Sequence, residues 1–268
     1  MGIASLAMYV EPGDLKQAHE DLWAGIRDRL RAAGFAAPDS LDWTISYDAA
    51  WLDPRLVLAQ TCGLPLVGSL AGKVRLVATP TYSFPGAEGD QRASVVIVHR
   101  DFTCQGIEDL RGRKAAINEL ESNSGTNLLR ALVAPHAREG RFFGSVITTG
   151  DHLISIERVH SGAVDVAAID SVTYGHVARY APDMIRDIRI LCLTPAGPGL
   201  PFITRRDAPD NEVEALRVAI AEAIADPSLK PVVDLIGIDG VTFPDEGDYA
   251  ILARYKLEAE ALGYPEVA

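Results

Sequence analysis

The segment from Glu119 to Asn127, Glu-Leu-Glu-Ser-Asn-Ser-Gly-Thr-Asn, combines the groups that proteins use to bind small anions. Ser122, Ser124 and Thr126 supply hydroxyl donors, and Gly125 allows the backbone to approach a ligand closely. If a helix begins here, its first N–H groups have no acceptor within the helix and attract negative charge. The same hydroxyls also act as ordinary helix N-caps, so the segment alone fits both an anion site and a simple cap.

Two later segments again combine a polar turn with a helix start. Thr149-Gly-Asp-His152 brings a hydroxyl and an imidazole together, and His152 is able to donate a hydrogen bond to an oxyanion. A histidine at a helix start is otherwise an ordinary half-exposed residue, and Asp151 is expected to cap this helix. In Asp170-Ser-Val-Thr173, Asp170 either caps the helix or faces a cation or hydroxyl of a ligand.

Aromatic residues stand at the ends of predicted strands in the first third of the chain. They are Tyr9, Tyr47 with Trp51, and Tyr82. Such rings line clefts and contribute phenolic donors, although each ring alone is more often part of a packed core. Ligands of open α/β sheets bind beyond the carboxyl ends of the strands, so we expect these rings and the polar helix starts to serve one ligand site.

Sequence motifs of catalysis and metal binding are missing from the chain. It has no GxxxxGK[ST], GxGxxG, HExxH or GxSxG motif. The histidines show no metal-ligand spacing, and Cys62, Cys104 and Cys192 form no CxxC motif, so we expect free thiols. We therefore predict no cofactor, no metal site and no catalytic residue, which favours a binding protein over an enzyme.

The composition is that of an acidic globular protein. Of the 268 residues, 48% are hydrophobic and 23% are charged, and the formal net charge is −12. No basic tract offsets this charge, which argues against a nucleic-acid partner or an anionic membrane surface. A small anionic ligand remains compatible, because a local site can overrule the field of the whole protein.

Strand-like and helix-like segments alternate along the chain, which predicts an α/β fold with mostly parallel sheets and helices on both faces. Apolar runs predict strands at 3–10, 41–47, 74–79, 92–100, 114–118, 144–148, 164–169 and 188–193. Helical spacing predicts helices at 15–30, 54–61, 124–138, 151–161, 171–180, 211–225, 230–237 and 248–262.

Two very hydrophobic strands, 94–98 and 188–193, bracket the middle of the chain. They suggest that one lobe is inserted into another, with crossings near residues 99 and 193; a single large sheet is the alternative. The predicted first lobe is 1–98 plus 194–268, and the second is 99–193. The apolar residues of the C-terminal helix are expected to pack on the first lobe.

Several segments together resemble the phosphonate, phosphate and phosphite substrate-binding proteins of ABC importers. They are Leu58-Ala-Gln-Thr-Cys-Gly63, Val77-Ala-Thr-Pro-Thr-Tyr82, Asp109-Leu-Arg-Gly112, Asn118 with Ser122-Asn-Ser-Gly-Thr-Asn127, Thr149-Gly-Asp-His152 and Asp165-Val-Ala-Ala-Ile-Asp170. The resemblance implies the type II periplasmic-binding-protein fold, in which two α/β lobes with mixed, mostly parallel sheets close over a ligand in the cleft between them.

The resemblance also implies roles for individual residues. The oxyanion would be held by the hydroxyls and amides of Ser122, Ser124, Gly125 and Thr126, with His152 alongside. The rest of the ligand would be recognised by tyrosines of the other lobe and an acidic residue, which correspond here to Tyr9, Tyr47, Tyr82 and Asp170.

Two features differ from the family pattern. Exported members carry a signal or lipoprotein segment, whereas the apolar run 1–10 has no basic residues and stops at Glu11. The resemblance implies the periplasm, and the cytoplasm is the alternative. Asp151 adds a negative charge beside the proposed anion site. If it faces inward, the ligand is less charged than phosphate or zwitterionic; if it only caps its helix, nothing changes.

The leading hypothesis is a non-enzymatic solute-binding protein that closes over a small oxyanion or organophosphonate for ABC-type uptake, with an ABC permease as partner. The first alternative is a cytosolic enzyme on the same fold, with His152 as base and Asp170 orienting it. The second alternative is a ligand sensor that docks on a protein through the C-terminal helix.

Overall fold

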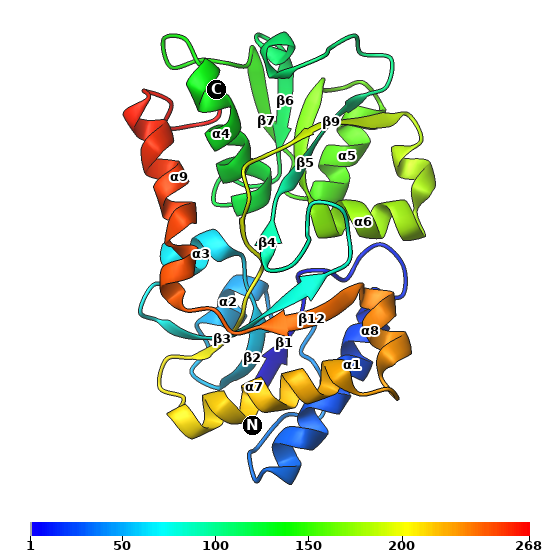
Figure 1. Ribbon diagram of the computed structural model, residues 1–268, viewed down its shortest axis with the longest axis vertical. Helices are drawn as coiled ribbons and strands as arrows, with labels where there is room; N and C mark the ends of the chain where they lie inside the picture. The colour runs from blue at the N-terminus through cyan, green and yellow to red at the C-terminus, as the bar shows by residue number, and fades with distance from the viewer. Residues whose placement is uncertain (1) are drawn as a thin grey trace. The chain divides into compact units, whose positions relative to one another are not determined.

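The computed structural model describes residues 2–268, so Met1, which belongs to the predicted first lobe, lies outside the described residues. The chain divides into two compact units, and Figure 1 colours their segments by residue number. The first unit contains the chain up to Ser83, then 88–90 and 198–248. The second unit contains 84–87, 91–197 and 249–268.

These units differ from the predicted lobes, 1–98 plus 194–268 and 99–193, in three places: the second unit also contains 84–87 with 91–98, 194–197 and 249–268. The apolar strand β5 (Ser94–His99) belongs to the second unit, because its backbone pairs there with strands on both sides. The C-terminal residues from Tyr249 onward also belong to the second unit. Hydrophobicity predicted that β5 is a buried strand. Its pairing with β8 and β9, which the sequence does not reveal, places it in the second unit.

The first unit is built on a mixed five-stranded sheet with the order β1-β2-β11-β3-β12. Strand β1 is parallel to β2, whereas β11 is antiparallel to β2 and β3, and β12 is antiparallel to β3. The strands are β1 (Ile3–Ser5), β2 (Leu56–Gln60), β11 (Phe202–Arg205), β3 (Val74–Tyr82) and β12 (Ile238–Thr242). The helices are α1 (Leu15–Ala32), α2 (Tyr47–Trp51), α3 (Gly63–Val67), α7 (Asp210–Ala225) and α8 (Lys230–Ile236).

Two predicted elements of the first unit are wrong. The predicted helix at 54–61 is strand β2, whose five residues are all buried, so the run has neither a helical nor an alternating pattern. The predicted strand at 41–47 is a series of bends. Asp42 causes this, because its Oδ1 accepts hydrogen bonds from the backbone N–H groups of Thr44 at 2.8 Å and Ile45 at 3.2 Å and turns the chain.

The second unit is built on a five-stranded sheet with the order β7-β6-β8-β5-β9. Strands β7, β6 and β8 are parallel, and β5 runs antiparallel to β8 and β9. The strands are β6 (Lys114–Ile117), β7 (Ser145–Thr148), β8 (Val166–Asp170) and β9 (Ile188–Leu193), with the short β4 (Gln91–Arg92) and β10 (Gly197–Pro198). The helices are α4 (Leu128–Val133), α5 (His152–His160), α6 (Ser171–Tyr180) and α9 (Ala250–Ala261).

Short turns of helix complete the described chain. They are the π-helical turn η2 (Asn123–Asn127) and the 3-10 turns η1 (Ile107–Leu110), η3 (Ala134–His136), η4 (Pro182–Ile185) and η5 (Glu246–Tyr249). Within residues 2–268, no helix has both the length and the apolar character needed to cross a membrane.

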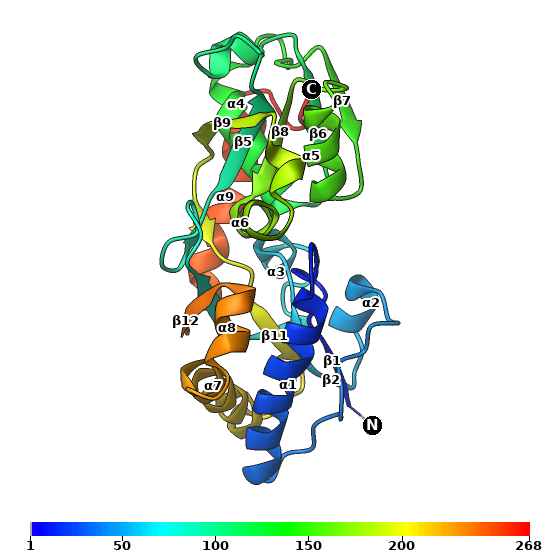
Figure 2. The ribbon, with the colours of Figure 1, turned by 90° about the vertical axis from the view of Figure 1, so that its right-hand side faces the viewer.

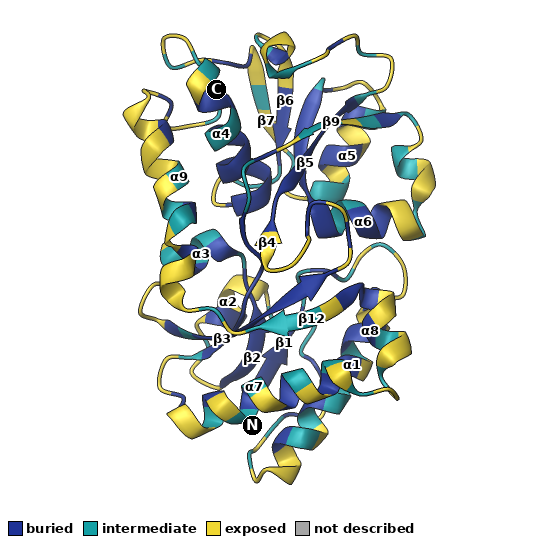
Figure 3. Cartoon of the chain, viewed as in Figure 1, coloured by how far each residue is buried: buried dark blue, intermediate teal, exposed yellow. Residues whose placement is uncertain are grey.

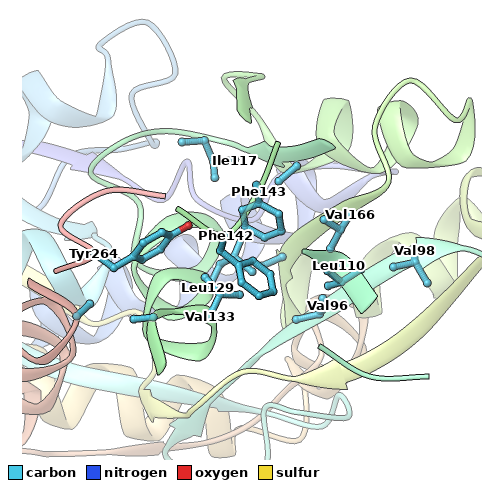
Figure 4. Packing of buried hydrophobic residues seen from close by; sticks show 14 of the residues in the cluster. Val96, Val98, Leu110, Ile117, Leu129, Val133, Phe142, Phe143, Val166 and Tyr264 are labelled. Atoms are coloured by element: carbon cyan, nitrogen blue, oxygen red, sulfur yellow. The ribbon is translucent and has the colours of Figure 1, made fainter. Parts of the chain in front are cut away.

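The sheet of the second unit is covered on both faces, as the strand–helix alternation predicts. Val96 and Val98 of β5 point into a cluster with α4 and α9, which includes Leu129 and Tyr264 (Figure 4). The alternate residues of β5 point into a second cluster with α5 and α6. Figure 2 shows α4 and α5 on opposite sides of the sheet, and Figure 3 shows β5 and β6 largely buried.

The C-terminal helix α9 packs on the second unit, which corrects the expectation that it packs on the first lobe. Asn127 Nδ2 donates to the backbone carbonyl of Leu252 at 3.0 Å, and Tyr255 donates through its hydroxyl to the carbonyl of Ala196 at 2.9 Å. Leu252 is fully buried, whereas Leu257 on the same helix is 62% exposed. Tyr249 and Leu252 are buried, but Leu262 is exposed like Leu257, so the apolar pattern identified only some of the buried residues and not the unit on which they pack.

Truncating Leu252 tests this packing. We expect Leu252→Ala to lower the free energy of unfolding by about 2–5 kcal/mol, because a fully buried side chain leaves a cavity. Leu257→Ala is the matched control on the same helix, and we expect a change within about 0.5 kcal/mol. Urea unfolding followed by circular dichroism measures both. Equal changes in the two variants would contradict the packing described here.

Candidate functional site

The polar segment after β6 folds into a tight turn that leads into α4. The backbone N–H of Asn127 donates to the carbonyl of Ser122, five residues earlier, at 3.0 Å. Ser122 Oγ accepts a hydrogen bond from the N–H of Gly125 at 3.2 Å, so Ser122 is the N-cap and retains its own proton to donate. Thr126 donates its hydroxyl proton to the carbonyl of Glu119 at 2.6 Å, which makes it a support for the turn.

Gly125 is required by close packing inside this turn. A Cβ atom at this position would lie 1.9 Å from Asn118 Oδ1 and 3.1 Å from His152 Cε1. The first distance is far below van der Waals contact and the second is tight, so a larger residue requires the side chain of Asn118 or the turn itself to shift. The Oδ1 atom of Asn118 is itself buried and has no hydrogen-bond partner among residues 2–268.

Ser124 and His152 meet at the centre of the candidate site. Ser124 Oγ lies 2.9 Å from His152 Nε2, and the hydroxyl of Ser94 donates to the backbone carbonyl of Ser124 at 2.9 Å. The other ring nitrogen of His152, Nδ1, is buried without a hydrogen-bond partner in the described chain. If Nε2 carries the proton, Ser124 has its hydroxyl proton left to donate; if Nδ1 carries it, the ring has a donor left over. Either tautomer leaves a donor for a ligand.

Burial sets the charge of His152. Removal from water lowers the pKa of its imidazole, and this effect outweighs the opposite effects of Asp170, Asp151 and Glu119. The ring is therefore neutral at neutral pH. It interacts with an anion as a hydrogen-bond donor and not as a counter-ion.

Asp170 ends β8 and caps α6. Its Oδ1 accepts from the backbone N–H of Val172 at 2.8 Å and of Thr173 at 3.3 Å, so the capping alternative is confirmed. Arg92 Nη1 lies 3.9 Å from the same oxygen, and both side chains are buried. The carboxylate thus has protein partners on its helix and on β4.

Asp151 and Thr149 hold the segment that precedes α5. The carboxylate of Asp151 accepts from the N–H of Leu153, which confirms the predicted cap. Thr149 Oγ1 lies 3.1 Å from the carbonyl of Ile117, 2.9 Å from that of Asp151 and 2.7 Å from Ser155 Oγ. These contacts occupy its hydroxyl within the protein, so Thr149 supports the site.

The four predicted aromatic residues gather in the first unit around Gln60. Tyr9 and Tyr82 make an edge-to-face contact with ring centroids 5.6 Å apart, and Tyr47 and Trp51 lie 5.0 Å apart. Trp51 Nε1 donates to the carbonyl of Gln60 at 2.9 Å. The Gln60 amide in turn lies 3.5 Å from the hydroxyl of Tyr82. Three of these rings are buried, while Tyr47 is 39% exposed.

The structure thus brings the polar candidates together in one unit and the aromatic candidates together in the other. Sequence reasoning missed Arg92, Ser94, Asn118 and Gln60. Gln60 and Asn118 lie in segments that carry the family resemblance but have no predicted role, and Gln60 also falls in a predicted helix. Arg92 and Ser94 lie in a predicted apolar strand, where hydrophobicity is the only signal. Residues 2–268 contain no group of three or more histidine, cysteine or acidic side chains placed to hold a metal ion.

Adding a methyl group at Gly125 tests the packing of the turn. We expect Gly125→Ala to lower the free energy of unfolding by about 1–3 kcal/mol, because the methyl group overlaps Asn118. Gly106→Ala is the matched control, since a Cβ there meets no atom within 4 Å and its φ of −154° suits alanine. Urea unfolding compares the two. If Asn118→Ala does not recover part of the loss in the double variant, the overlap is not the cause.

The buried imidazole predicts a pH dependence of stability. The folded protein holds the pKa of His152 below the value of about 6.5 in an unfolded chain. The unfolded chain then binds more protons in mild acid, so stability is lost as the pH falls from about 7.5 to about 5.5. We expect His152→Gln, which does not titrate, to lose less stability over this range in urea unfolding. Equal losses in both proteins would show that His152 does not contribute.

Comparison with known proteins identifies the family and the fold of the chain. The sequence profile of one family, described as the periplasmic substrate-binding protein of phosphonate ABC transporters, matches residues 58–249. A search of the curated proteins found no match.

Solved structures share the fold at low sequence identity. A binding protein component of an ABC phosphonate transporter from Pseudomonas aeruginosa has a TM-score of 0.76 at 15% identity, over 98% of this chain and 87% of that one. PhnD1 from Prochlorococcus marinus, in complex with methylphosphonate, has a TM-score of 0.74 at 15% identity, over 97% of this chain and 98% of that one. XAC2383 from Xanthomonas citri, bound to ATP, has a TM-score of 0.71 at 17% identity, over 98% of this chain and 97% of that one.

These matches confirm the predicted type II periplasmic-binding-protein fold and a solute-binding role. The family profile covers well over half of the chain. The chain therefore belongs to the family of periplasmic substrate-binding proteins of phosphonate ABC transporters.

Proposed function

We propose that this protein binds a small tetrahedral oxyanion or organophosphonate and that the second unit holds the oxyanion. The observation that carries the proposal is the contact between Ser124 and His152, 2.9 Å apart, beside a buried imidazole nitrogen that lacks a partner within residues 2–268. A ligand oxygen would satisfy the donor that this contact leaves over.

The proposed binding groups are neutral donors from the turn after β6 and from the start of α5. They are the hydroxyls of Ser122 and Ser124, the imidazole of His152 and the first N–H groups of the turn from 123 to 127. Thr126, Gly125, Thr149 and Asp170 support these groups through their own contacts. In the first unit, we propose the aromatic cluster around Gln60 as a further ligand-binding surface, with Tyr47 as its exposed ring.

The arrangement supports binding over catalysis. A serine next to a histidine resembles a nucleophile and its base, but a working base is oriented by a third group at its other nitrogen. Nδ1 of His152 has no such partner in the described chain, and Asp170 instead caps α6 and faces Arg92. We therefore propose a non-enzymatic role in uptake, in the periplasm and with an ABC permease.

Removing both central donors tests the site. We expect Ser124→Ala combined with His152→Ala to weaken oxyanion binding by about tenfold or more, because each change removes a hydrogen bond to a charged group. The ligands are phosphate, phosphite, methylphosphonate, 2-aminoethylphosphonate and sulfate. Isothermal titration calorimetry on protein refolded free of carried-over ligand gives the affinities.

The control for this test is Ser161→Ala, an exposed serine at the end of α5 in the same unit. We expect it to bind as the wild type does. Unchanged affinity in the double variant would contradict the site. A wild-type protein that binds none of the five oxyanions would contradict the proposed ligand class and favour the enzymatic alternative.

A further inference from the structure

A buried ion pair lies next to the proposed oxyanion site. Arg92 is 2% exposed and its Nη1 atom lies 3.9 Å from Oδ1 of Asp170, which is equally buried. A buried guanidinium loses much of its hydration, so it is retained only where a negative group compensates it. The pair is therefore a fixed feature of the second unit and not a mobile surface contact.

Strand register connects this pair to the proposed site. Ser94, two residues after Arg92, stands opposite Asp170 in the β5–β8 ladder. The hydroxyl of Ser94 donates to the carbonyl of Ser124, whose own hydroxyl contacts His152. The charge of Asp170 also reaches the imidazole, because Asp170 is the largest of the three acidic influences that raise the pKa of His152 against burial. A change in the net charge of the Arg92–Asp170 pair therefore changes the electrostatic potential at the proposed site.

Arg92 changes what this carboxylate does to a ligand. An isolated Asp170 would repel an oxyanion and attract the ammonium group of a zwitterionic ligand. Paired with Arg92, the two side chains together carry no net charge. Asp151 and Glu119, the other carboxylates that influence His152, are less buried than Asp170, and Asp151 caps α5, so water screens them more effectively.

We infer that Arg92 is a specificity-determining residue: by neutralising Asp170, it adapts the site to oxyanions that lack an ammonium group, such as phosphite and simple alkylphosphonates, and disfavours aminophosphonates. This inference rests on the proposed function. It assigns to Asp170 a role different from the one that the family resemblance implies, since Oδ1 of the carboxylate accepts the cap hydrogen bonds and faces Arg92. Arg92 acts through Asp170 and is a positioning residue.

The test compares two ligands that differ by an aminomethyl group, methylphosphonate and 2-aminoethylphosphonate, in four proteins. These are the wild type, Arg92→Gln, Asp170→Asn and the double variant. We expect the wild type to bind methylphosphonate more tightly. Arg92→Gln exposes the charge of Asp170, so the ratio of the two dissociation constants shifts by about tenfold or more towards 2-aminoethylphosphonate. In the double variant both charges are absent, and the ratio returns towards the wild-type value.

The ratio separates a charge effect from a structural one. A loosened site weakens the binding of both ligands alike and leaves the ratio of their dissociation constants unchanged. The inferred effect weakens the binding of methylphosphonate relative to that of 2-aminoethylphosphonate and therefore changes the ratio. Arg186→Gln is the control, because it removes an arginine that is exposed on the surface of the same unit; we expect its ratio to equal that of the wild type. Arg92→Lys keeps the charge, and we expect it to keep the preference for methylphosphonate.

Each outcome separates this inference from the proposed function. If the wild type binds no oxyanion, the proposed function fails. If the wild type binds methylphosphonate but a folded Arg92→Gln keeps the wild-type ratio, only the inference about Arg92 is overturned. If Arg92→Gln does not fold, the wild type and Arg92→Lys decide: tighter binding of 2-aminoethylphosphonate by either protein overturns the inference, and a preference of both for methylphosphonate supports it.

Discussion

The close approach between Gly125 and Asn118 determines how the chain leaves β6. With no side chain at Gly125, the carboxamide of Asn118 fits against the backbone, and the turn adopts its π-helical hydrogen bond between Asn127 and Ser122. This conformation directs Ser124 to the imidazole of His152 and its carbonyl to Ser94. The polar contacts of the site are therefore built around a close approach between Gly125 and the side chain of Asn118.

Most polar groups around this turn satisfy one another, and the exceptions are informative. Thr126, Thr149, Asp151 and Asp170 all use their side chains to hold backbone groups of adjacent helix starts. The imidazole nitrogen of His152 and the amide oxygen of Asn118 are buried without partners within residues 2–268. Buried polar atoms without partners are rare in folded proteins, so each of them calls for an explanation. The same short segments thus contain two kinds of residue: those whose side chains bind backbone groups and support the site, and those with a hydrogen-bonding group left for a ligand.

Local pattern predicted much of this structure, and non-local pairing accounts for what it missed. The alternation of strands and helices predicted the α/β class. The predicted polar helix starts are also present, since Ser122, Asp151 and Asp170 cap the helical segments that follow them. Strand β2 was misassigned because a run buried on both faces has no periodicity, and Asp42 turned a predicted strand into bends. Arg92 lies 78 positions before Asp170, and nothing near it in sequence indicates that pair. The packing of α9 on the second unit is likewise a contact between distant segments.

The neutrality of His152 has a consequence for the environment in which such a site works. Burial keeps the imidazole uncharged, and Arg92 is compensated by Asp170. In the proposed site, an oxyanion would be bound by directed hydrogen bonds from hydroxyl, imidazole and backbone groups, without a net positive charge. Dissolved ions screen attractions between charges much more than they weaken short, dry hydrogen bonds. A site of this design therefore retains its ligand when the ionic strength of its surroundings rises and falls.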